Sequence, residues 1–158
     1  MIFICDTMLG RLSRYLRMLG LDAPCANSPA SADAWGHTGL QPYFFTKRLK
    51  APRYERTVHI RSDRIMEQLE EIRPIISPHV MPDAVMSRCI ECNVPLVAVA
   101  REDVEHHVPE YIYHHHAGFK QCPSCKKVYW SGSHTEKMKK WIEGITAAHS
   151  KTPLNRKA

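Results

Sequence analysis

The sequence predicts a small α/β domain with a partly parallel sheet, followed by a smaller unit that is organised around a metal ion. Short apolar runs typical of buried strands alternate with helical patterns, in the order strand, helix, strand, strand, helix. Two Cys-x-x-C sequences follow in the second half of the chain. Between these regions, three prolines within residues 73–87 indicate a connecting segment.

The first strand and helix have the clearest pattern. Residues 2–5 are apolar and lead into an acid, Asp6, and a helix is predicted from about Thr7. Asp6 or Thr7 can accept hydrogen bonds at the start of that helix, and Gly20 can end it. Four leucines recur at helical spacing and predict its buried face, namely Leu9, Leu12, Leu16 and Leu19.

The remaining elements of the first unit are shorter. Residues 42–46 and 56–60 are rich in aromatic and β-branched residues and predict two strands. Ser62 is predicted to cap a helix over residues 63–72, which has apolar residues on one side. Because the strands alternate with helices, at least part of the sheet is expected to be parallel.

The charge balance favours an anionic partner. The chain holds 22 Lys and Arg against 16 Asp and Glu, which gives a formal net charge of +6 at pH 7. Such an excess is typical of nucleic-acid-binding proteins, although many basic proteins bind none. In the first helix, Arg11, Arg14 and Arg17 recur every three residues, so they form one stripe that either faces solvent or contacts an anion.

The sequence does not predict insertion into a membrane. It has no apolar run long enough to span a bilayer, and Asp6 interrupts the first apolar run too early for a signal peptide. We therefore expect a cytoplasmic protein with no membrane partner. In that compartment the six cysteines are expected to be thiols or metal ligands, with Cys5 and Cys25 as buried thiols.

The two Cys-x-x-C sequences predict a zinc site formed by Cys89, Cys92, Cys122 and Cys125. Each sequence places two thiolates on one tight turn, and two such turns supply the four ligands of a tetrahedral ion. The alternatives are a redox pair, which normally occurs once and at a helix start, or an iron–sulfur cluster. With four protein ligands the zinc would be structural and would fold a unit with little core of its own.

Other features of the second unit have more than one interpretation. The histidines within residues 106–116 are either metal ligands or solvated loop side chains that help to bind anions when protonated, and adjacent histidines do not converge on one ion in a helix or strand. Tyr129 and Trp130 either pack inside the unit or stack on bases. A capping box at residues 133–136 predicts a last helix to about residue 148.

Asp6 follows a central strand, where α/β folds place their ligands. It is therefore either a simple helix cap or a metal ligand, and a metal ligand needs further acids nearby. Asp63 follows the third predicted strand and is a plausible second ligand, while Asp22 lies just past the first helix and Asp33 in an irregular segment. Carboxylates of this kind are the ligands that Mg²⁺ prefers.

Several strings of the chain resemble the Mut7-C RNase domain family. In order, they are "DTMLGRLSRYLRMLGLD", "RSDRIMEQLEEI", "RCIECNVPL", "VP" at residues 108–109, and "CPSCKKVYWSGSHTEKM". The resemblance covers nearly the whole chain, and its Leu-Gly-Arg-Leu and Tyr-Trp-x-Gly-x-His strings are unusual. It implies a PIN-like three-layer α/β domain joined to a zinc ribbon, and RNA cleavage by divalent ions held between clustered acids.

The resemblance also implies catalytic residues. Asp6 matches the acid after the family's first strand, and Asp63 matches the acid before its second long helix. Asp22 matches the acid that closes the family's Leu-Gly-x-Asp string, where a structural role is equally compatible.

One position departs from the family pattern. Where the family has Leu-Thr-Arg-Asp, residues 45–48 of this chain are Phe-Thr-Lys-Arg, so Arg48 occupies the position of an acid. A guanidinium there opposes metal binding and attracts phosphate directly. The expected RNA contacts are therefore the helix stripe and this segment, namely Arg11, Arg14, Arg17, Lys47 and Arg48.

These patterns predict a PIN-like domain over residues 1–86, a zinc ribbon with a terminal helix over residues 87–150, and a basic tail over residues 151–158. Three functions are compatible with them. The chain is a Mg²⁺- or Mn²⁺-dependent endoribonuclease, a non-catalytic module that binds an RNA such as tRNA or the ribosome, or an adaptor that binds a protein through its ribbon. The expected cofactors are structural zinc and, for the enzyme, Mg²⁺ or Mn²⁺.

Overall fold

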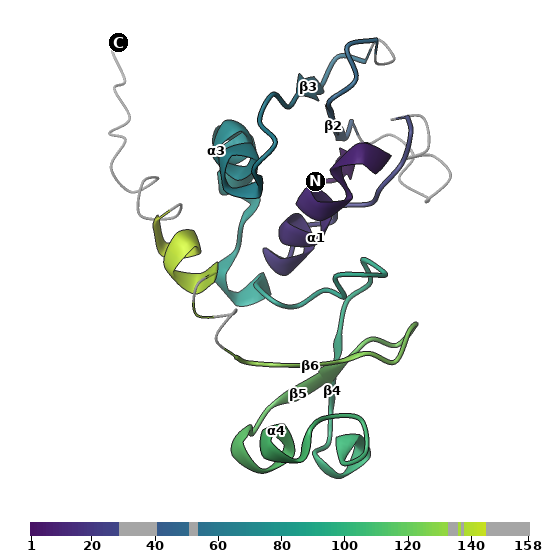
Figure 1. Cartoon of the computed structure of the whole chain (residues 1–158), viewed down its shortest axis with the longest axis vertical. Coiled ribbons are helices and arrows are strands. Elements are labelled where there is room, and N and C mark those ends of the chain that lie inside the picture. The colour runs from purple at the N-terminus through teal and green to yellow at the C-terminus, as the bar shows by residue number, and fades with distance from the viewer. Residues whose placement is uncertain (29–40, 51–53, 133–135, 137, 145–158) are drawn as a thin grey trace, which may run out of the picture.

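The computed structural model describes residues 1–28, 41–50, 54–132, 136 and 138–144. Two three-stranded sheets organise these residues, one parallel and the other antiparallel (Figure 1). The predicted mixed α/β class and the parallel pairing of the first half are therefore confirmed. The predicted basic tail, most of the capping box and Asp33 lie outside the described residues.

The parallel sheet forms from three short strands, of which the first two are mostly buried. They are β1 (Phe3–Cys5), β2 (Tyr43–Thr46) and β3 (Thr57–His59), in the order β1-β2-β3. Residues 22–26 run parallel to β1 on its other side, through bridges that pair Ile2 with Asp22 and Cys5 with Cys25. Because all these segments run in one direction, their carboxyl ends meet at one edge, which we call the carboxyl edge.

The first helix begins as the short 3-10 turn η1 (Thr7–Leu9) and continues as α1 (Gly10–Met18). Asp6 caps η1 by accepting a 3.3 Å hydrogen bond from the Met8 amide, and the four predicted leucines are all buried. Gly20, at φ +81°, ends the helix as predicted, because Leu21 N–H then donates to the Leu16 carbonyl. A Cβ at Gly20 would lie 2.2 Å from the Ala84 carbonyl oxygen, so this turn also fixes how closely residue 84 approaches.

The helix predicted over residues 63–72 is α3 (Ile65–Ile76), and both of its predicted ends were wrong. Arg64, and not Ser62, is the N-cap residue. The amides of Arg61 and Ser62 instead donate to the Glu71 carboxylate, at 2.9 and 2.7 Å, which holds this segment outside the helix. The helix then continues through Pro74, and the connecting turns follow it as η2 (Ser77–His79) and η3 (Pro82–Ala84).

The main core lies between one face of the parallel sheet and the helices α1 and α3. Its residues include Phe3, Phe45, Leu12, Leu16, Leu69 and Ile72, and a smaller cluster of Ile2, Ile4, Ala26 and Phe44 covers the other face. Met138 and Ile142, from helical residues after β6, belong to the main core. The chain therefore returns to the first unit after the antiparallel sheet (Figure 1), whereas the division at residues 86 and 87 stays a prediction.

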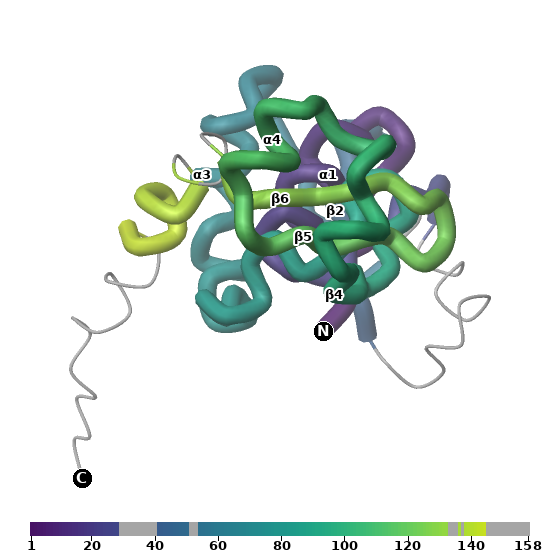
Figure 2. Tube along the Cα trace, turned by 90° about the horizontal axis from the view of Figure 1, so that it is seen from below, coloured from purple at the N-terminus to yellow at the C-terminus, as the bar shows by residue number. Residues whose placement is uncertain are grey.

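The antiparallel sheet has the order β4-β5-β6, formed by β4 (Val97–Val99), β5 (Phe119–Gln121) and β6 (Val128–Trp130). The turn η4 (Glu102–Val104) and the helix α4 (Glu110–His115) lie between β4 and β5. Val104, Phe119 and Val128 form a small separate core. Figure 2 shows this sheet and α4 in front of the first unit. Within the described ranges, no helix has the length and apolar character needed to cross a membrane.

Candidate functional site

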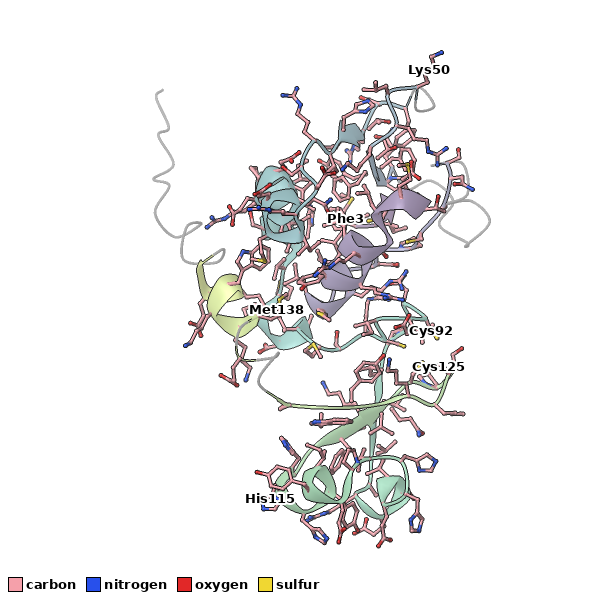
Figure 3. The ribbon with its side chains drawn as sticks, viewed as in Figure 1. Phe3, Lys50, Cys92, His115, Cys125 and Met138 are labelled. Carbon is pink, nitrogen blue, oxygen red and sulfur yellow. The ribbon has the colours of Figure 1, made fainter. Side chains whose placement is uncertain are left out.

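The four cysteines predicted as metal ligands lie together. Cys89 and Cys92 precede β4, whereas Cys122 and Cys125 lie in the β5–β6 turn, and Figure 3 shows Cys92 beside Cys125. All four Sγ atoms lie within 4.8 Å of one another, and the Cys89 and Cys125 sulfurs are 3.7 Å apart. Sulfurs that bind one tetrahedral zinc ion at about 2.3 Å are about 3.8 Å apart, so the four cysteines are positioned to hold a metal such as zinc.

Both Cys-x-x-C turns have the same local structure. The residue after each turn, Asn93 or Lys126, has a positive φ of 61° or 64°. Each of these residues donates its amide to the carbonyl of the first cysteine of its turn, at 2.9 and 3.0 Å. The amides of Cys92 and Cys125 approach the sulfurs of Cys89 and Cys122 at 3.3 and 3.4 Å. Such amide donation stabilises thiolates, which are the form that binds metal.

Tyr129 supports the cysteine site from β6. Its hydroxyl lies 3.1 Å from Cys89 Sγ and accepts a 3.2 Å hydrogen bond from the Ile90 amide. Burial alone would raise the pKa of Cys89, but hydrogen bonds from Tyr129 and from nearby amides lower it to about 6. The Tyr129 hydroxyl is thus directed at the cysteine site, and Trp130 packs against the small core of the second unit.

At the carboxyl edge, Asp6 forms a bidentate ion pair with Arg48. The Asp6 side chain is 0% exposed, and Arg48 Nε and Nη2 lie 2.6 and 2.7 Å from its two carboxylate oxygens. The Thr46 hydroxyl donates a third hydrogen bond, 2.6 Å long, to the same carboxylate. Arg48 therefore places a positive charge directly beside the acid that was predicted as the first catalytic residue.

The pair is ionised at neutral pH. Burial raises the pKa of Asp6, but hydrogen bonds from Arg48, Thr46 and the Met8 amide, together with the Arg48 charge, lower it to about 2. The hydrogen bond to Asp6 in turn raises the pKa of Arg48. Asp6 therefore remains a carboxylate whose two oxygens already accept strong, charge-assisted hydrogen bonds.

Asn27, which was not among the predicted site residues, completes the surroundings of Arg48. Its Oδ1 accepts hydrogen bonds from Arg48 Nη2 at 3.0 Å and from the Thr7 hydroxyl at 2.9 Å. This contact exists because residues 22–26 run beside β1 and bring Asn27 to the carboxyl edge. No local motif marks such a residue.

The other two predicted acids lie in different surroundings. Asp63 is 91% exposed and forms an ion pair with Lys47, which lowers its pKa. Asp22 pairs with Ile2 at the amino end of β1, so it lies at the opposite edge of the sheet from Asp6. Its carboxylate accepts a 2.6 Å hydrogen bond from Asn93, next to the first cysteine turn. Among the described residues, the four cysteines are the one group of three or more potential ligands that the structure brings together.

The predicted arginine stripe is divided between two environments. Arg17 is 7% exposed and donates to three carbonyls, those of Ala23, Ile90 and Glu91, at 2.9, 2.7 and 2.8 Å. It therefore connects α1 to the first cysteine turn. Arg14 forms a 3.0 Å ion pair with Glu91, and Arg11 is exposed.

The two remaining cysteines differ in exposure. Cys5 is buried as predicted, whereas the prediction of a buried Cys25 was wrong, because residues 22–26 form the outer edge next to β1 and leave that side chain exposed. Burial raises the pKa of the Cys5 thiol well above its usual value, and the neighbouring Cys25 adds to the increase.

These features define an α/β protein with four cysteines positioned to hold a metal such as zinc and, at the carboxyl edge, a carboxylate paired with a guanidinium. The family model of the Mut7-C RNAse domain matches residues 1–142, so the chain belongs to the Mut7-C RNAse domain family. Comparisons with curated proteins and with solved structures gave no match. Membership of the family indicates an RNA-related, nuclease-like function.

Proposed function

We propose that this chain binds RNA and that its carboxyl edge holds RNA phosphates without metal-dependent cleavage. The observation that carries the proposal is the bidentate ion pair between Arg48 and the buried Asp6. In this proposal Arg48 takes the place of the divalent ion that the family's acid cluster would hold. The PIN-like character of the first unit and resident zinc in the second are parts of the same proposal.

Competition for the carboxylate supports this function. A Mg²⁺ ion needs free oxygen lone pairs in near-octahedral geometry, usually from one or two carboxylates together with waters and substrate phosphates. The oxygens of Asp6 accept hydrogen bonds from Arg48 and Thr46, so an ion would have to displace a guanidinium of like charge. Asp63, the second acid at this side, is itself paired with Lys47.

Neutralisation of Asp6 also favours an anionic ligand at the carboxyl edge. A bare buried carboxylate would repel phosphate, whereas the ion pair has no net charge. Exposed cations near the edge, such as Lys50 and Arg61, then supply the attraction (Figure 3 labels Lys50). In this proposal Arg11 and Arg14 contact phosphate from α1, Lys47 and Arg48 shape the edge, and Arg17 has a structural role because it is buried.

A second candidate function is a metal-dependent endoribonuclease that uses Asp6 and Asp63. It is favoured by one observation, that Asp6 directly follows β1 at the carboxyl edge, where α/β proteins place their catalytic groups. It requires Arg48 to leave the Asp6 carboxylate when metal and RNA bind.

Binding and cleavage assays on the purified full chain distinguish these functions. Labelled single-stranded and structured RNAs are incubated with Mn²⁺ or with EDTA at several salt concentrations. We expect binding that weakens steeply with salt, does not require added Mn²⁺ and produces no cleavage. Mn²⁺-dependent cleavage that Asp6→Asn abolishes would overturn the proposal in favour of the enzyme. Absence of RNA binding at low salt would also overturn it, in favour of an adaptor that binds a protein.

Arg48→Asp is the sharpest variant, because it restores an acid where the family has one. If Arg48 excludes the metal, this variant binds Mn²⁺ more tightly than the wild-type chain, which isothermal titration detects. The matched control is Arg48→Asp combined with Asp6→Asn, which should lose the added Mn²⁺ affinity. Equal Mn²⁺ binding by the wild-type chain and Arg48→Asp would contradict the proposed role of Arg48.

A further inference from the structure

Cys5 and Cys25 are distant in the sequence but directly opposite each other in the sheet. Cys5 is the last residue of β1, and the parallel bridge at the outer side of β1 pairs it with Cys25. The Cys5 amide donates to the Pro24 carbonyl at 2.9 Å, and the Ala26 amide donates to the Cys5 carbonyl at 2.9 Å. These two hydrogen bonds fix the register on both sides of the cysteine pair.

The two cysteine side chains are on the same side of the sheet. Along β1, Phe3 and Cys5 belong to the main core, whereas Ile2 and Ile4 belong to the cluster on the other face. Ala26 belongs to the cluster with Ile4, so Cys25, one residue earlier, faces the side of Cys5. Neighbouring strands lie about 4.7–4.9 Å apart. That spacing falls within the Cα separation of about 4.4–6.8 Å that a disulfide requires.

We propose that Cys5 and Cys25 form a redox modification site, in which a hydroperoxide oxidises the two thiols to a disulfide. Cys25 is exposed and Cys5 is 0% exposed, so the oxidant reaches Cys25 first. The Cys25 sulfur takes one peroxide oxygen and becomes a sulfenic acid, and the second oxygen leaves as water or as an alcohol. The Cys5 sulfur then attacks the Cys25 sulfur, the S–O bond breaks, and the hydroxyl leaves as water with the Cys5 proton. Two thiols thus lose two electrons to one peroxide.

The disulfide would constrain the carboxyl edge around Arg48. Cys5 immediately precedes Asp6, and Cys25 lies two residues before Asn27. Asp6 and Asn27 both accept hydrogen bonds from Arg48 Nη2, at 2.7 and 3.0 Å. A covalent bond between the two segments therefore fixes the two acceptors of Arg48 relative to each other. This inference does not depend on RNA binding.

Peptide mapping of the full, metal-loaded chain tests the site. The chain is treated with a small molar excess of hydrogen peroxide, alkylated, and digested with trypsin without reductant. We expect residues 1–11 joined to residues 18–47 by a disulfide, with release after reduction and no loss of zinc. Closing this loop should raise the midpoint of thermal unfolding by about 5–10 °C.

Cys25→Ser is the matched control, because the changed side chain is exposed and the variant should fold like the wild-type chain. Peroxide should then form no linked peptide and should not shift the unfolding midpoint. The proposal is overturned if Cys5 remains alkylatable after unfolding while Cys25 is oxidised to a sulfinic acid. Crosslinks from Cys25 to a second chain or to the zinc cysteines would overturn it as well.

Discussion

The four-cysteine site and the Asp6 site both concentrate negative charge, but they neutralise it in different ways. At the cysteine site, four sulfurs within 4.8 Å of one another are positioned to hold a metal ion, which would balance the charge of their thiolates. At the carboxyl edge, Arg48 supplies the positive charge from within the chain and contacts both oxygens of Asp6. The difference teaches that the source of the positive charge can differ within one chain: a guanidinium supplies it at Asp6, whereas the four cysteines are positioned to take it from an ion.

Removal of one cysteine should have the largest effect. Cys122→Ser leaves three sulfurs, and we expect loss of bound zinc and of the β4–β6 sheet, since zinc binding supplies about 10–16 kcal/mol in small zinc-folded peptides. Elemental analysis gives the metal content, and amide NMR spectra report the sheet. Cys25→Ser is the control and should retain one metal ion per chain. An unchanged metal content in Cys122→Ser would show that the four cysteines do not bind the metal together.

Arg17→Ala should have the next largest effect, because Arg17 connects the cysteine site to the first unit. The variant leaves the Ile90 and Glu91 carbonyls without the Arg17 donor, while the Ala23 carbonyl keeps the Ser13 hydroxyl, and this should lower the free energy of unfolding by about 3 kcal/mol. Urea unfolding with zinc present measures this change. Arg17→Lys should recover only part of it, since lysine lacks the planar fork of donors.

Arg11→Ala is the matched control for Arg17, since it removes the same charge from an exposed position of the same helix. We expect it to change the free energy of unfolding by less than about 0.5 kcal/mol. Equal effects of the two substitutions would show that Arg17 has no special connecting role.

Titration of Asp6 tests whether Arg48 neutralises this carboxylate in solution. The carboxyl ¹³C shift of Asp6 should titrate with a pKa of about 2, below the ordinary value of 3.8, and Arg48→Ala should raise this pKa. Since the pKa is lower in the folded chain, this carboxylate contributes its full stabilisation above about pH 4 and loses it as the pH falls towards 2. An Asp6 pKa near 3.8 in the folded wild-type chain would show that Arg48 does not hold the carboxylate in solution.

Asp63→Asn should have the smallest effect. Asp63 is 91% exposed, and ion pairs at such positions contribute little to stability. We expect no change in the midpoint of thermal unfolding, measured by circular dichroism. Asp6→Asn makes the same change at a buried position and should lower the midpoint clearly. If both variants behaved alike, burial would not distinguish the two acids.

Much of the architecture followed from local patterns. The leucine spacing in α1 fixes which side of the helix is buried, because the helical repeat depends only on the residues themselves. The spacing within each Cys-x-x-C turn similarly places two sulfurs together without help from the rest of the fold. The strands at residues 43–46 and 57–59 were also predicted. The start of α3 was not, because the Arg61 and Ser62 amides donate to the Glu71 carboxylate, which lies ten and nine residues further along the chain.

The sequence alone determined the class of the chain, its leucine face and its two Cys-x-x-C turns, because each depends on periodicity or spacing over a few residues. Only the tertiary structure decided the roles of individual charges and thiols. It paired Arg48 with Asp6, 42 positions apart, and directed Arg17 to carbonyls 73 and 74 positions away. It also set Cys5 opposite Cys25. The physical reason is that ion pairs, buried hydrogen bonds and strand register depend on which segments become neighbours, and no local pattern encodes that proximity.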